Sequence, residues 1–227
     1  MRTLIIEDHL LVSSGFRLLL AEFTPIENIV ECANGVAAMI KIRESNFELV
    51  LLDWNLGHAE GPAGAPLIRE IKAAQPAARV VIVSGDTRPE TVHAAIEAGA
   101  AGYIFKDTDP AHLVDVLRIL QRGGTYLPEL ALADRDGRRD RAETESGFGA
   151  RRGELREIGI VFPRLTPRHV DVLNCLVRGM SNKEIARQLD ITDGTVKQHL
   201  MAIFRELGVD NRTEAVYLLA KSGVRFP

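Results

Sequence analysis

Short apolar runs alternate with helical patterns over residues 1–122. Consecutive hydrophobic residues predict buried strands, and apolar residues three or four apart predict amphipathic helices, for example over 13–22 and 110–121. The predicted strands are Thr3–Ile6, Ile29–Cys32, Leu49–Leu52, Val80–Val83 and Gly102–Ile104. Because crossover helices join parallel strands, this alternation predicts an α/β domain with a doubly wound, five-stranded parallel sheet.

A second pattern, helical throughout, begins after Phe162. Helices are predicted over 167–178, 182–189, 193–207 and 212–221. Capping pairs mark three of the starts: Thr166 with Pro167, Ser181 with Glu184, and Asn211 with Glu214. Glycines mark the expected ends: Gly179, Gly208 and Gly223. Four helices with a tight turn between the middle two predict an all-α helix-turn-helix domain.

The stretch between these patterns has no periodicity. Residues 133–156 are rich in glycine and in charges of both signs, which is typical of a linker. Residues 154–162 fit a short helix or a strand equally well. We therefore predict an α/β domain over 1–122, a linker over 123–163 and a helical domain over 164–227.

Composition is that of a globular protein of the cytoplasm. Of the 227 residues, 46% are hydrophobic and 26% are charged. No run of about 18 apolar residues occurs, and acidic residues follow Met1 too soon for a signal peptide, so we expect no membrane partner. Cys32 and Cys175 lie in apolar contexts and are predicted to be buried thiols.

Charge is distributed unevenly between the predicted parts. Residues 1–122 hold 11 Lys and Arg against 16 Asp and Glu, a net charge of −5. Residues 164–227 hold 10 against 7, a net charge of +3. The difference suggests metal or phosphate chemistry in the first domain and nucleic acid as the partner of the second.

Three acidic residues lie at the carboxyl ends of two predicted strands. Glu7 and Asp8 follow the first strand, and Asp53 follows the third. Because the carboxyl ends of parallel strands meet at one edge of the sheet, we expect these side chains to converge there. Converging carboxylates repel one another unless a cation offsets them, and oxygen ligands of this kind suit Mg²⁺.

Two further polar residues are predicted at the same edge. Ser84 follows the fourth strand and Lys106 follows the fifth. A carboxylate nucleophile with a metal, a hydroxyl and a lysine is the set that transient phosphorylation of an aspartate needs. Each residue alone is more often a helix cap or a loop residue. The hypothesis depends on all five arriving at strand ends.

These residues, with the segment Gly102–Lys106, resemble the receiver domain of bacterial response regulators. The resemblance implies a flavodoxin-like fold in which Asp53 accepts a phosphoryl group. It implies that three carboxylates and one main-chain carbonyl hold Mg²⁺: Glu7, Asp8, Asp53 and Asn55. It also implies that Ser84 and Lys106 contact the phosphoryl group, and that Tyr103 is an aromatic switch whose ring turns inward as Ser84 moves. A half-buried aromatic residue on an edge strand is the alternative for Tyr103.

One segment departs from the receiver pattern. Receivers usually continue after the phospho-acceptor with a Met-Pro step and a short loop. This chain instead has a glycine- and proline-rich stretch from Leu56 to Pro66, which predicts an irregular loop before the next helix. His58 and Glu60 within it suggest an added metal site, with a solvated loop as the simpler interpretation.

The helical domain closely resembles the LuxR-type helix-turn-helix. The resemblance rests on four segments in the family's order and spacing: 165–168, 179–186, 195–200 and 211–215. A receiver joined to this domain is the arrangement of the NarL/FixJ subfamily. The two resemblances cover about 185 of the 227 residues.

The resemblance implies that the helix beginning near Asp193 enters the major groove of double-stranded DNA. Its base-contacting positions are Lys197, Gln198 and Met201: lysine can donate to guanine, glutamine can pair with adenine, and methionine offers an apolar surface to thymine. Packing inside the protein is the alternative for Met201. DNA phosphates would be held at four positions: Asn182, Lys183, Thr195 and Arg212.

His169 stands where the family usually has glutamate. Counted from Thr166 the position is N3, where glutamate closes a capping box. A positively charged histidine cannot do this, so we predict a slightly less stable helix start and no change in function.

Apolar residues of the last predicted helix have two candidate roles. They are Ala215, Val216, Leu218, Leu219 and Ala220. Part of the set must be core, and by resemblance this helix also forms the interface of a homodimer on paired DNA half-sites.

The expected function is a transcription regulator controlled by phosphorylation. A histidine kinase would phosphorylate Asp53, and promoter binding by an active homodimer would change. No enzyme activity is expected beyond self-phosphorylation and self-dephosphorylation. A phosphatase or phosphotransferase is one alternative, but it would need a second general acid, and Asn55 occupies the nearest place. A constitutive DNA binder whose receiver only docks or dimerises is the other, and the intact acidic site disfavours it.

Overall fold

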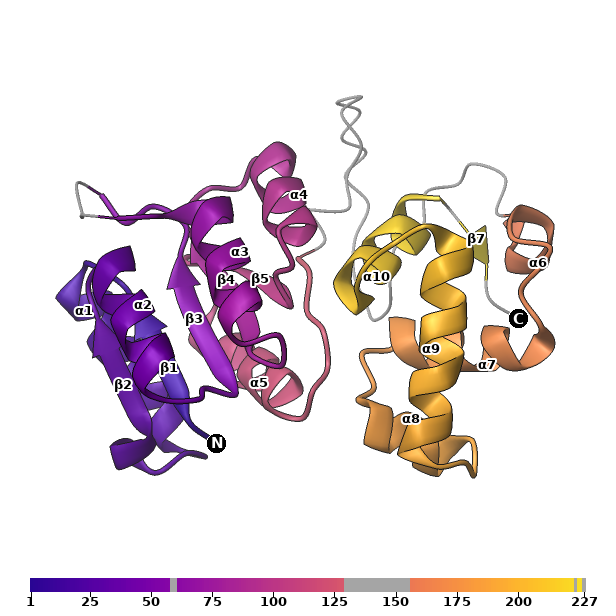
Figure 1. The fold of residues 1–227 in the computed structure, drawn as a ribbon, viewed down its shortest axis with the longest axis horizontal. Helices are drawn as coiled ribbons and strands as arrows, with labels where there is room; N and C mark the ends of the chain where they lie inside the picture. Colours follow the sequence, from indigo (N-terminus) through magenta and orange to yellow (C-terminus); the bar gives the residue numbers. More distant parts are fainter. Residues whose placement is uncertain (58–60, 129–155, 223, 226–227) are drawn as a thin grey trace. The chain divides into compact units, whose positions relative to one another are not determined.

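The computed structural model describes residues 1–57, 61–128, 156–222 and 224–225 (Figure 1). The chain divides into two compact units, Met1–Pro128 and Glu129–Pro227. Among the described residues, no helix has the length and apolar character needed to cross a bilayer.

The first unit is built on a parallel sheet with strand order β2-β1-β3-β4-β5. The strands are β1 (Thr3–Ile6), β2 (Ile29–Cys32), β3 (Leu49–Asp53), β4 (Arg79–Ser84) and β5 (Gly102–Phe105). The helices are α1 (Leu10–Ala21), α2 (Gly35–Glu44), α3 (Gly64–Ala74), α4 (Pro89–Glu97) and α5 (Pro110–Gln121), with a 3-10 turn, η1, over Ile26–Asn28. The predicted doubly wound sheet is confirmed, and every predicted strand is present.

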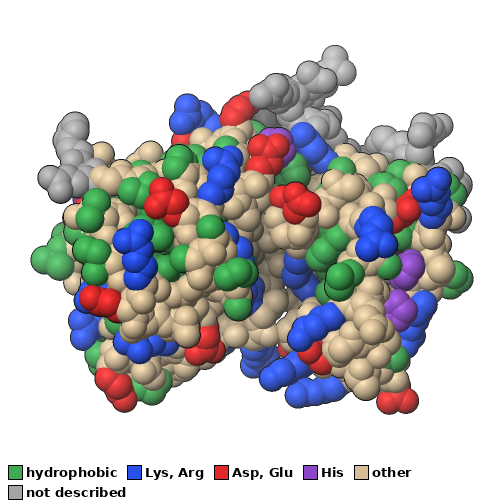
Figure 2. Space-filling model, viewed as in Figure 1, with side chains coloured by type: hydrophobic (Ala, Val, Ile, Leu, Met, Phe, Trp, Pro, Cys, Tyr) green, Lys and Arg blue, Asp and Glu red, His purple; other side chains and the backbone are tan. Residues whose placement is uncertain are grey.

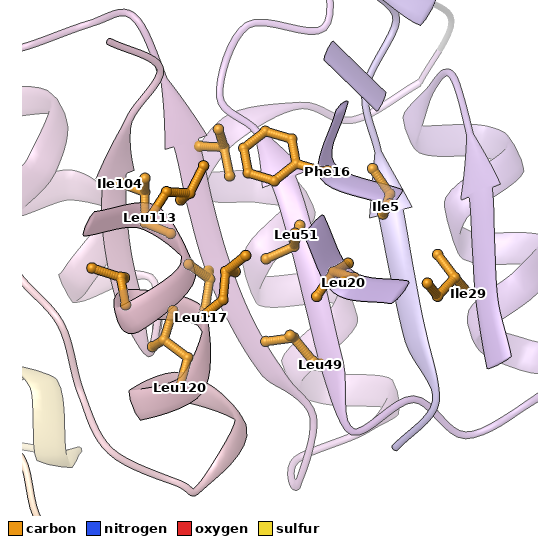
Figure 3. Packing of buried hydrophobic residues seen from close by; sticks show 13 residues of the cluster. Ile5, Phe16, Leu20, Ile29, Leu49, Leu51, Ile104, Leu113, Leu117 and Leu120 are labelled. Atoms are coloured by element: carbon orange, nitrogen blue, oxygen red, sulfur yellow. The ribbon is translucent and has the colours of Figure 1, made fainter. Parts of the chain in front are cut away.

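Helices α1 and α5 cover one face of this sheet, while α2, α3 and α4 lie on the other (Figures 1 and 3). Phe16 and Leu20 of α1 pack with Leu117 of α5 against alternate residues of the strands, including Leu51 and Val81. Burying one such side chain contributes about 1.5–3 kcal/mol. Because both faces are covered, the strands are apolar without alternation, which explains why they are readable as continuous runs.

Two details of the first unit differ from expectation. The irregular loop ends earlier than predicted, because α3 already begins at Gly64 and takes Pro66 into its first turn. Proline is tolerated there, since the first N–H groups of a helix have no partner within it. Cys32 is half-buried rather than buried, although Cys175 is buried as expected, and both are free thiols. His58 and Glu60 lie outside the described residues.

Residues 123–128, which the sequence placed in the linker, lie against the edge strand of the first unit. The Tyr103 amide donates to the Tyr126 carbonyl at 3.1 Å, and Gly102 and Tyr126 form a parallel bridge. Arg79 stabilises the start of this segment, because its guanidinium donates to the carbonyl of Leu120 in α5 and to that of Gly124. Burial lowers the pKa of Arg79 to about 10, so its guanidinium still carries its charge at neutral pH. The segment therefore continues the sheet beside β5.

The second unit forms a helix over each predicted span. These are α7 (Pro167–Val177), α8 (Asn182–Gln188), α9 (Asp193–Leu207) and α10 (Arg212–Lys221). Side chains of Thr166, Ser181 and Asn211 cap α7, α8 and α10 as predicted, and Gly208 ends α9 with φ 68°. Gly223 lies outside the described residues. The segment that fitted helix or strand contains both, because β6 (Arg156–Glu157) pairs in parallel with β7 (Val224–Arg225) and α6 (Ile158–Val161) follows directly.

The close approach of Gly102 to the Tyr126 segment predicts the effect of a side chain at this glycine. A Cβ at Gly102 would lie 2.9 Å from the Tyr126 carbonyl oxygen. We expect Gly102→Ala to push residues 124–127 off β5 and to raise amide hydrogen exchange at Tyr103 by about tenfold, the equivalent of one hydrogen bond. Gly15→Ala is the control, since its Cβ would meet nothing within 4 Å. Equal protection of Tyr103 in both variants would contradict the contact.

Candidate functional site

Acidic side chains converge at the carboxyl edge of the sheet, as predicted. Glu7 and Asp8 follow β1, and Asp53 ends the neighbouring β3. Ligand atoms of these three residues and of His9 all lie within 4.8 Å of one another. Glu7 and Asp53 are 6% and 3% exposed, so water screens their charges weakly. His9 was not predicted as part of this cluster, although it directly follows the acidic pair in sequence.

Lys106 bridges two of these carboxylates. Its Nζ lies 2.9 Å from Oδ2 of Asp53 and 2.8 Å from Oε2 of Glu7. Burial raises the pKa of Asp53, and the nearby Glu7 raises it further, while the hydrogen bond from Lys106 acts in the opposite direction. The pKa of Lys106 is raised, because its two carboxylate partners outweigh the effect of burial. The lysine therefore remains a cation directed at the Asp53 carboxylate.

The donor set at this edge fits a divalent cation. Lys106 supplies one positive charge to three carboxylates. Oδ1 of Asp8 is buried and accepts no well-formed hydrogen bond, although His9 Nδ1 lies 2.9 Å away. Carboxylate oxygens with spare lone pairs suit Mg²⁺. The amide of Asn55 donates to Oδ1 of Asp53 at 3.2 Å, and its carbonyl as a metal ligand stays a prediction.

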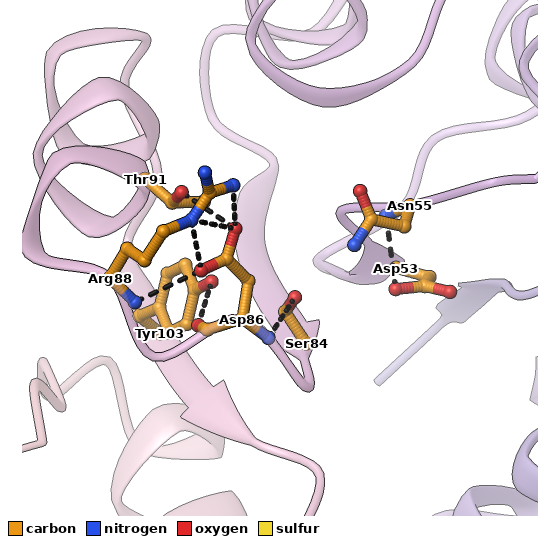
Figure 4. A network of polar contacts seen from close by, with 7 residues as sticks. All are labelled: Asp53, Asn55, Ser84, Asp86, Arg88, Thr91 and Tyr103. Atoms are coloured by element: carbon orange, nitrogen blue, oxygen red, sulfur yellow. Dashed lines mark hydrogen bonds and ion pairs between the residues drawn. The ribbon is translucent and has the colours of Figure 1, made fainter.

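Ser84 and Tyr103 lie on the side of Asp53 toward α4 (Figure 4). Both are fully buried. The Tyr103 hydroxyl donates to the carbonyl of Asp86 at 2.8 Å, and Ser84 Oγ accepts from the Asp86 amide at 3.0 Å. Burial raises the pKa of Tyr103 to about 12. The ring is therefore turned inward, and the alternative of a half-buried edge aromatic is wrong.

Helices α8 and α9 form the second candidate site. Val196, Leu200 and Ile203 of α9 are buried, which leaves the opposite side of this helix for solvent. Lys197 and Gln198 are exposed there, and Met201 is 66% exposed, so packing inside the unit is not its role. Lysine and arginine side chains also gather at the end of the unit where α8 lies (Figure 2).

The four predicted phosphate-contacting residues differ in their surroundings. Lys183 is exposed in the first turn of α8, beside half-buried Asn182. Thr195 shares a hydrogen bond with the hydroxyl of Thr192, the N-cap of α9. Arg212 donates to the carbonyls of Leu176 and Met180, and thereby ties α10 to the end of α7. Phosphate contact at these positions stays a prediction, and for Arg212 it would compete with this internal bond.

Comparison with known proteins identifies both units. Residues 3–118 match the response regulator receiver domain family, and residues 163–219 match the LuxR family of bacterial regulatory proteins. The chain belongs to the NarL/FixJ response regulators. The nitrate/nitrite response regulator NarP of Escherichia coli is 31% identical over 220 residues, which cover 96% of this chain and 93% of NarP.

Two other response regulators are similar over nearly their whole length. VraR of Staphylococcus aureus is 30% identical over 95% of this chain and 94% of its own. A structure of RcsB from Salmonella typhimurium has a TM-score of 0.53 at 22% identity, with 97% of this chain and 98% of that chain covered. The similarity to RcsB shows a shared fold only.

The N-terminal cap of α7 in the LuxR-type domain differs from expectation. His169 does close the capping box, because its Nδ1 accepts from the Thr166 amide at 3.3 Å while the Thr166 hydroxyl accepts from the His169 amide. Burial, and then the neighbouring His199 ring, lower the pKa of His169. The two rings are in edge contact, with centroids 5.5 Å apart. The prediction of a weaker helix start assumed a protonated ring. The lowered pKa favours the neutral ring, whose Nδ1 can accept the hydrogen bond.

The cap at His169 predicts a pH effect on the stability of the LuxR-type domain. Because folding lowers the pKa from 6.5, this contribution is complete above pH 6.5 and is lost as the pH falls through the folded-state pKa. We expect protection of the first amides of α7 from hydrogen exchange to fall between pH 7.5 and 5.5, by up to about 1 kcal/mol, the usual effect of losing a cap. In His169→Glu the carboxylate stays ionised over this range, so protection should be nearly constant. An equal fall in both proteins would rule out the histidine as its cause.

Proposed function

We propose that this response regulator binds promoter DNA under the control of phosphorylation at Asp53. A histidine kinase is the phosphodonor, and the LuxR-type domain acts as a homodimer on paired half-sites in the cytoplasm. The observation that supports the proposal most directly is the placement of Asp53. Its carboxylate is held by Lys106 beside two further acidic residues, on the same chain as a helix-turn-helix with an exposed polar recognition helix.

In the proposed reaction an oxygen of Asp53 attacks the phosphorus of a phosphohistidine. The new P–O bond forms as the P–N bond breaks, and the electron pair of that bond leaves with the imidazole, which takes up a proton. Lys106 stays protonated and pairs with the developing charge on the phosphoryl oxygens. When bound by Glu7, Asp8 and Asp53 with the carbonyl of Asn55, Mg²⁺ would neutralise further charge on the transferred group.

Ser84 and Tyr103 are proposed to report the phosphorylated state. Ser84 is buried at the end of β4, where its oxygen accepts from the Asp86 amide and its hydroxyl proton lies in a hydrogen bond with the Tyr103 side chain. Donation of that proton to the phosphoryl group would join β4 to the phosphorylated Asp53. The surface formed by α4 and β5 then depends on the state of Asp53, and it presents that change to the rest of the chain.

For the LuxR-type domain we propose that α9 lies in the major groove. Lys197, Gln198 and Met201 contact bases, and Asn182, Lys183, Thr195 and Arg212 contact phosphates. Ala215, Val216 and Leu219 of α10 are buried within the domain, which leaves the half-buried Leu218 and Ala220 for a dimer contact. RcsB, whose fold this chain shares, has been solved in complex with DNA.

Asp53 as the phospho-acceptor is tested with a small phosphodonor and Mg²⁺. We expect acetyl phosphate to give one acid-stable, base-labile phosphoryl group per chain, which is absent in Asp53→Asn and without Mg²⁺. Asp107→Asn is the control, since it removes an exposed acidic side chain next to Lys106 in sequence. Phosphorylation of Asp53→Asn at the wild-type level would place the acceptor elsewhere. Steady hydrolysis of acetyl phosphate, much faster than self-dephosphorylation of the chain accounts for, would favour a phosphatase.

Base contact by α9 is tested by substitution of a neutral residue. Gln198→Ala should weaken binding to the preferred promoter fragment by about 1–3 kcal/mol and relax base preference at one position of each half-site. Gln188→Ala, at the exposed end of α8, is the matched control and should have no effect. Lys183→Ala should instead weaken binding to all sequences alike and reduce the salt dependence by about one unit of slope. If Gln198→Ala behaves as Lys183→Ala does, α9 does not read bases at this position.

A further inference from the structure

Asp86, in the turn between β4 and α4, is more firmly fixed than a turn residue usually is. Its side chain is only 9% exposed. The carboxylate accepts from the Arg88 guanidinium at 2.6 and 2.9 Å, from the Arg88 amide at 2.9 Å, and from the Thr91 hydroxyl at 2.8 Å. The arginine holds the pKa of Asp86 well below its usual range, so the carboxylate is ionised at neutral pH.

The main chain of the same residue contacts both proposed switch residues. Its amide donates to Ser84 Oγ at 3.0 Å, and its carbonyl accepts from the Tyr103 hydroxyl at 2.8 Å (Figure 4). Ser84 and Tyr103 belong to different strands, β4 and β5, and Asp86 joins them. Any movement of the Asp86 backbone therefore changes the hydrogen bonds of both.

The side-chain anchors connect this backbone to α4. Thr91 is in the first turn of α4 and is 6% exposed, so its hydrogen bond to Asp86 is shielded from water. Arg88 is the N-cap residue of α4 and makes no side-chain cap bond, and Asp86 adds a carboxylate at this helix start to that of Glu90 in the first turn. The Arg88 side chain is 75% exposed, and an ion pair to so exposed a side chain contributes little. Thr91 is thus the more effective anchor.

We propose that Asp86 is a positioning residue that holds Ser84 and Tyr103 in the phosphoryl-binding arrangement before Asp53 is phosphorylated. This inference rests on the proposed function. If the turn were released, the inward state of Tyr103 would have to be formed during phosphorylation. The apparent affinity for a phosphoryl group falls by the fraction of molecules that are in the competent state. Asp86 therefore raises the affinity of Asp53 for a phosphoryl group without touching it.

The test is a titration of the full-length chain with beryllofluoride in the presence of Mg²⁺. Trp54, next to Asp53, is the only tryptophan in the sequence and reports binding by its fluorescence. We expect Asp86→Ala to weaken beryllofluoride binding by about tenfold, which corresponds to the loss of the hydrogen bonds to a charged group. Thr91→Val keeps the shape of the buried side chain and should weaken binding by about threefold. Arg88→Gln should change it by less than about twofold.

A double-mutant cycle separates positioning from a general loss of stability. If Asp86 acts through Tyr103, the effects of Asp86→Ala and Tyr103→Phe on beryllofluoride affinity should be clearly less than additive. Additive effects would overturn the proposal, as would variants that unfold at lower temperature but bind with wild-type affinity. Thr91→Val keeps the test valid if Asp86→Ala does not fold. A wild-type chain that binds no beryllofluoride would overturn the proposed function itself, and this inference with it.

Discussion

Parallel strands bring like charges together at one edge of the receiver sheet. Because β1 and β3 are neighbours in parallel register, the residues at their carboxyl ends must lie side by side, and here they are Glu7, Asp8 and Asp53. Lys106, from the end of β5, bridges two of them and leaves negative charge in excess. Ionisation of all three carboxylates is unfavourable in such an arrangement unless a cation offsets their repulsion. The chemistry of the chain thus follows from the topology of its sheet.

Much of this site was readable from the sequence, because strand ends in a parallel sheet share an edge. Residues that the topology alone places were predicted, among them Asp53, Ser84 and Lys106. The contacts of Asp86 with Thr91 and Tyr103 were not, since they depend on the path of one turn and on side-chain rotamers. The Tyr126 segment was missed for a similar reason. Its bridge to Gly102 is a main-chain contact between residues 24 positions apart, and no side-chain pattern marks it.

The LuxR-type domain was more predictable at its helix starts, because capping is local in sequence. Ser181 with Glu184 and Asn211 with Glu214 form the expected pairs. The cap at His169 is not local in this sense, because it depends on the protonation of the ring, which in turn depends on burial and on His199, 30 residues away in sequence. The contacts of Arg212 are not local either. We predicted a phosphate contact for this arginine, and its side chain donates to carbonyls at the end of α7.

The coupling between the two sites is tested most directly by DNA affinity. Binding of the full-length chain to genomic promoter fragments would be titrated with and without beryllofluoride and Mg²⁺. We expect beryllofluoride to tighten DNA binding by about 5- to 150-fold in the wild-type chain and to leave it unchanged in Asp53→Asn. Equal affinity in both conditions would contradict the coupling and leave a constitutive DNA binder. Absence of binding in either condition would contradict the role of α9.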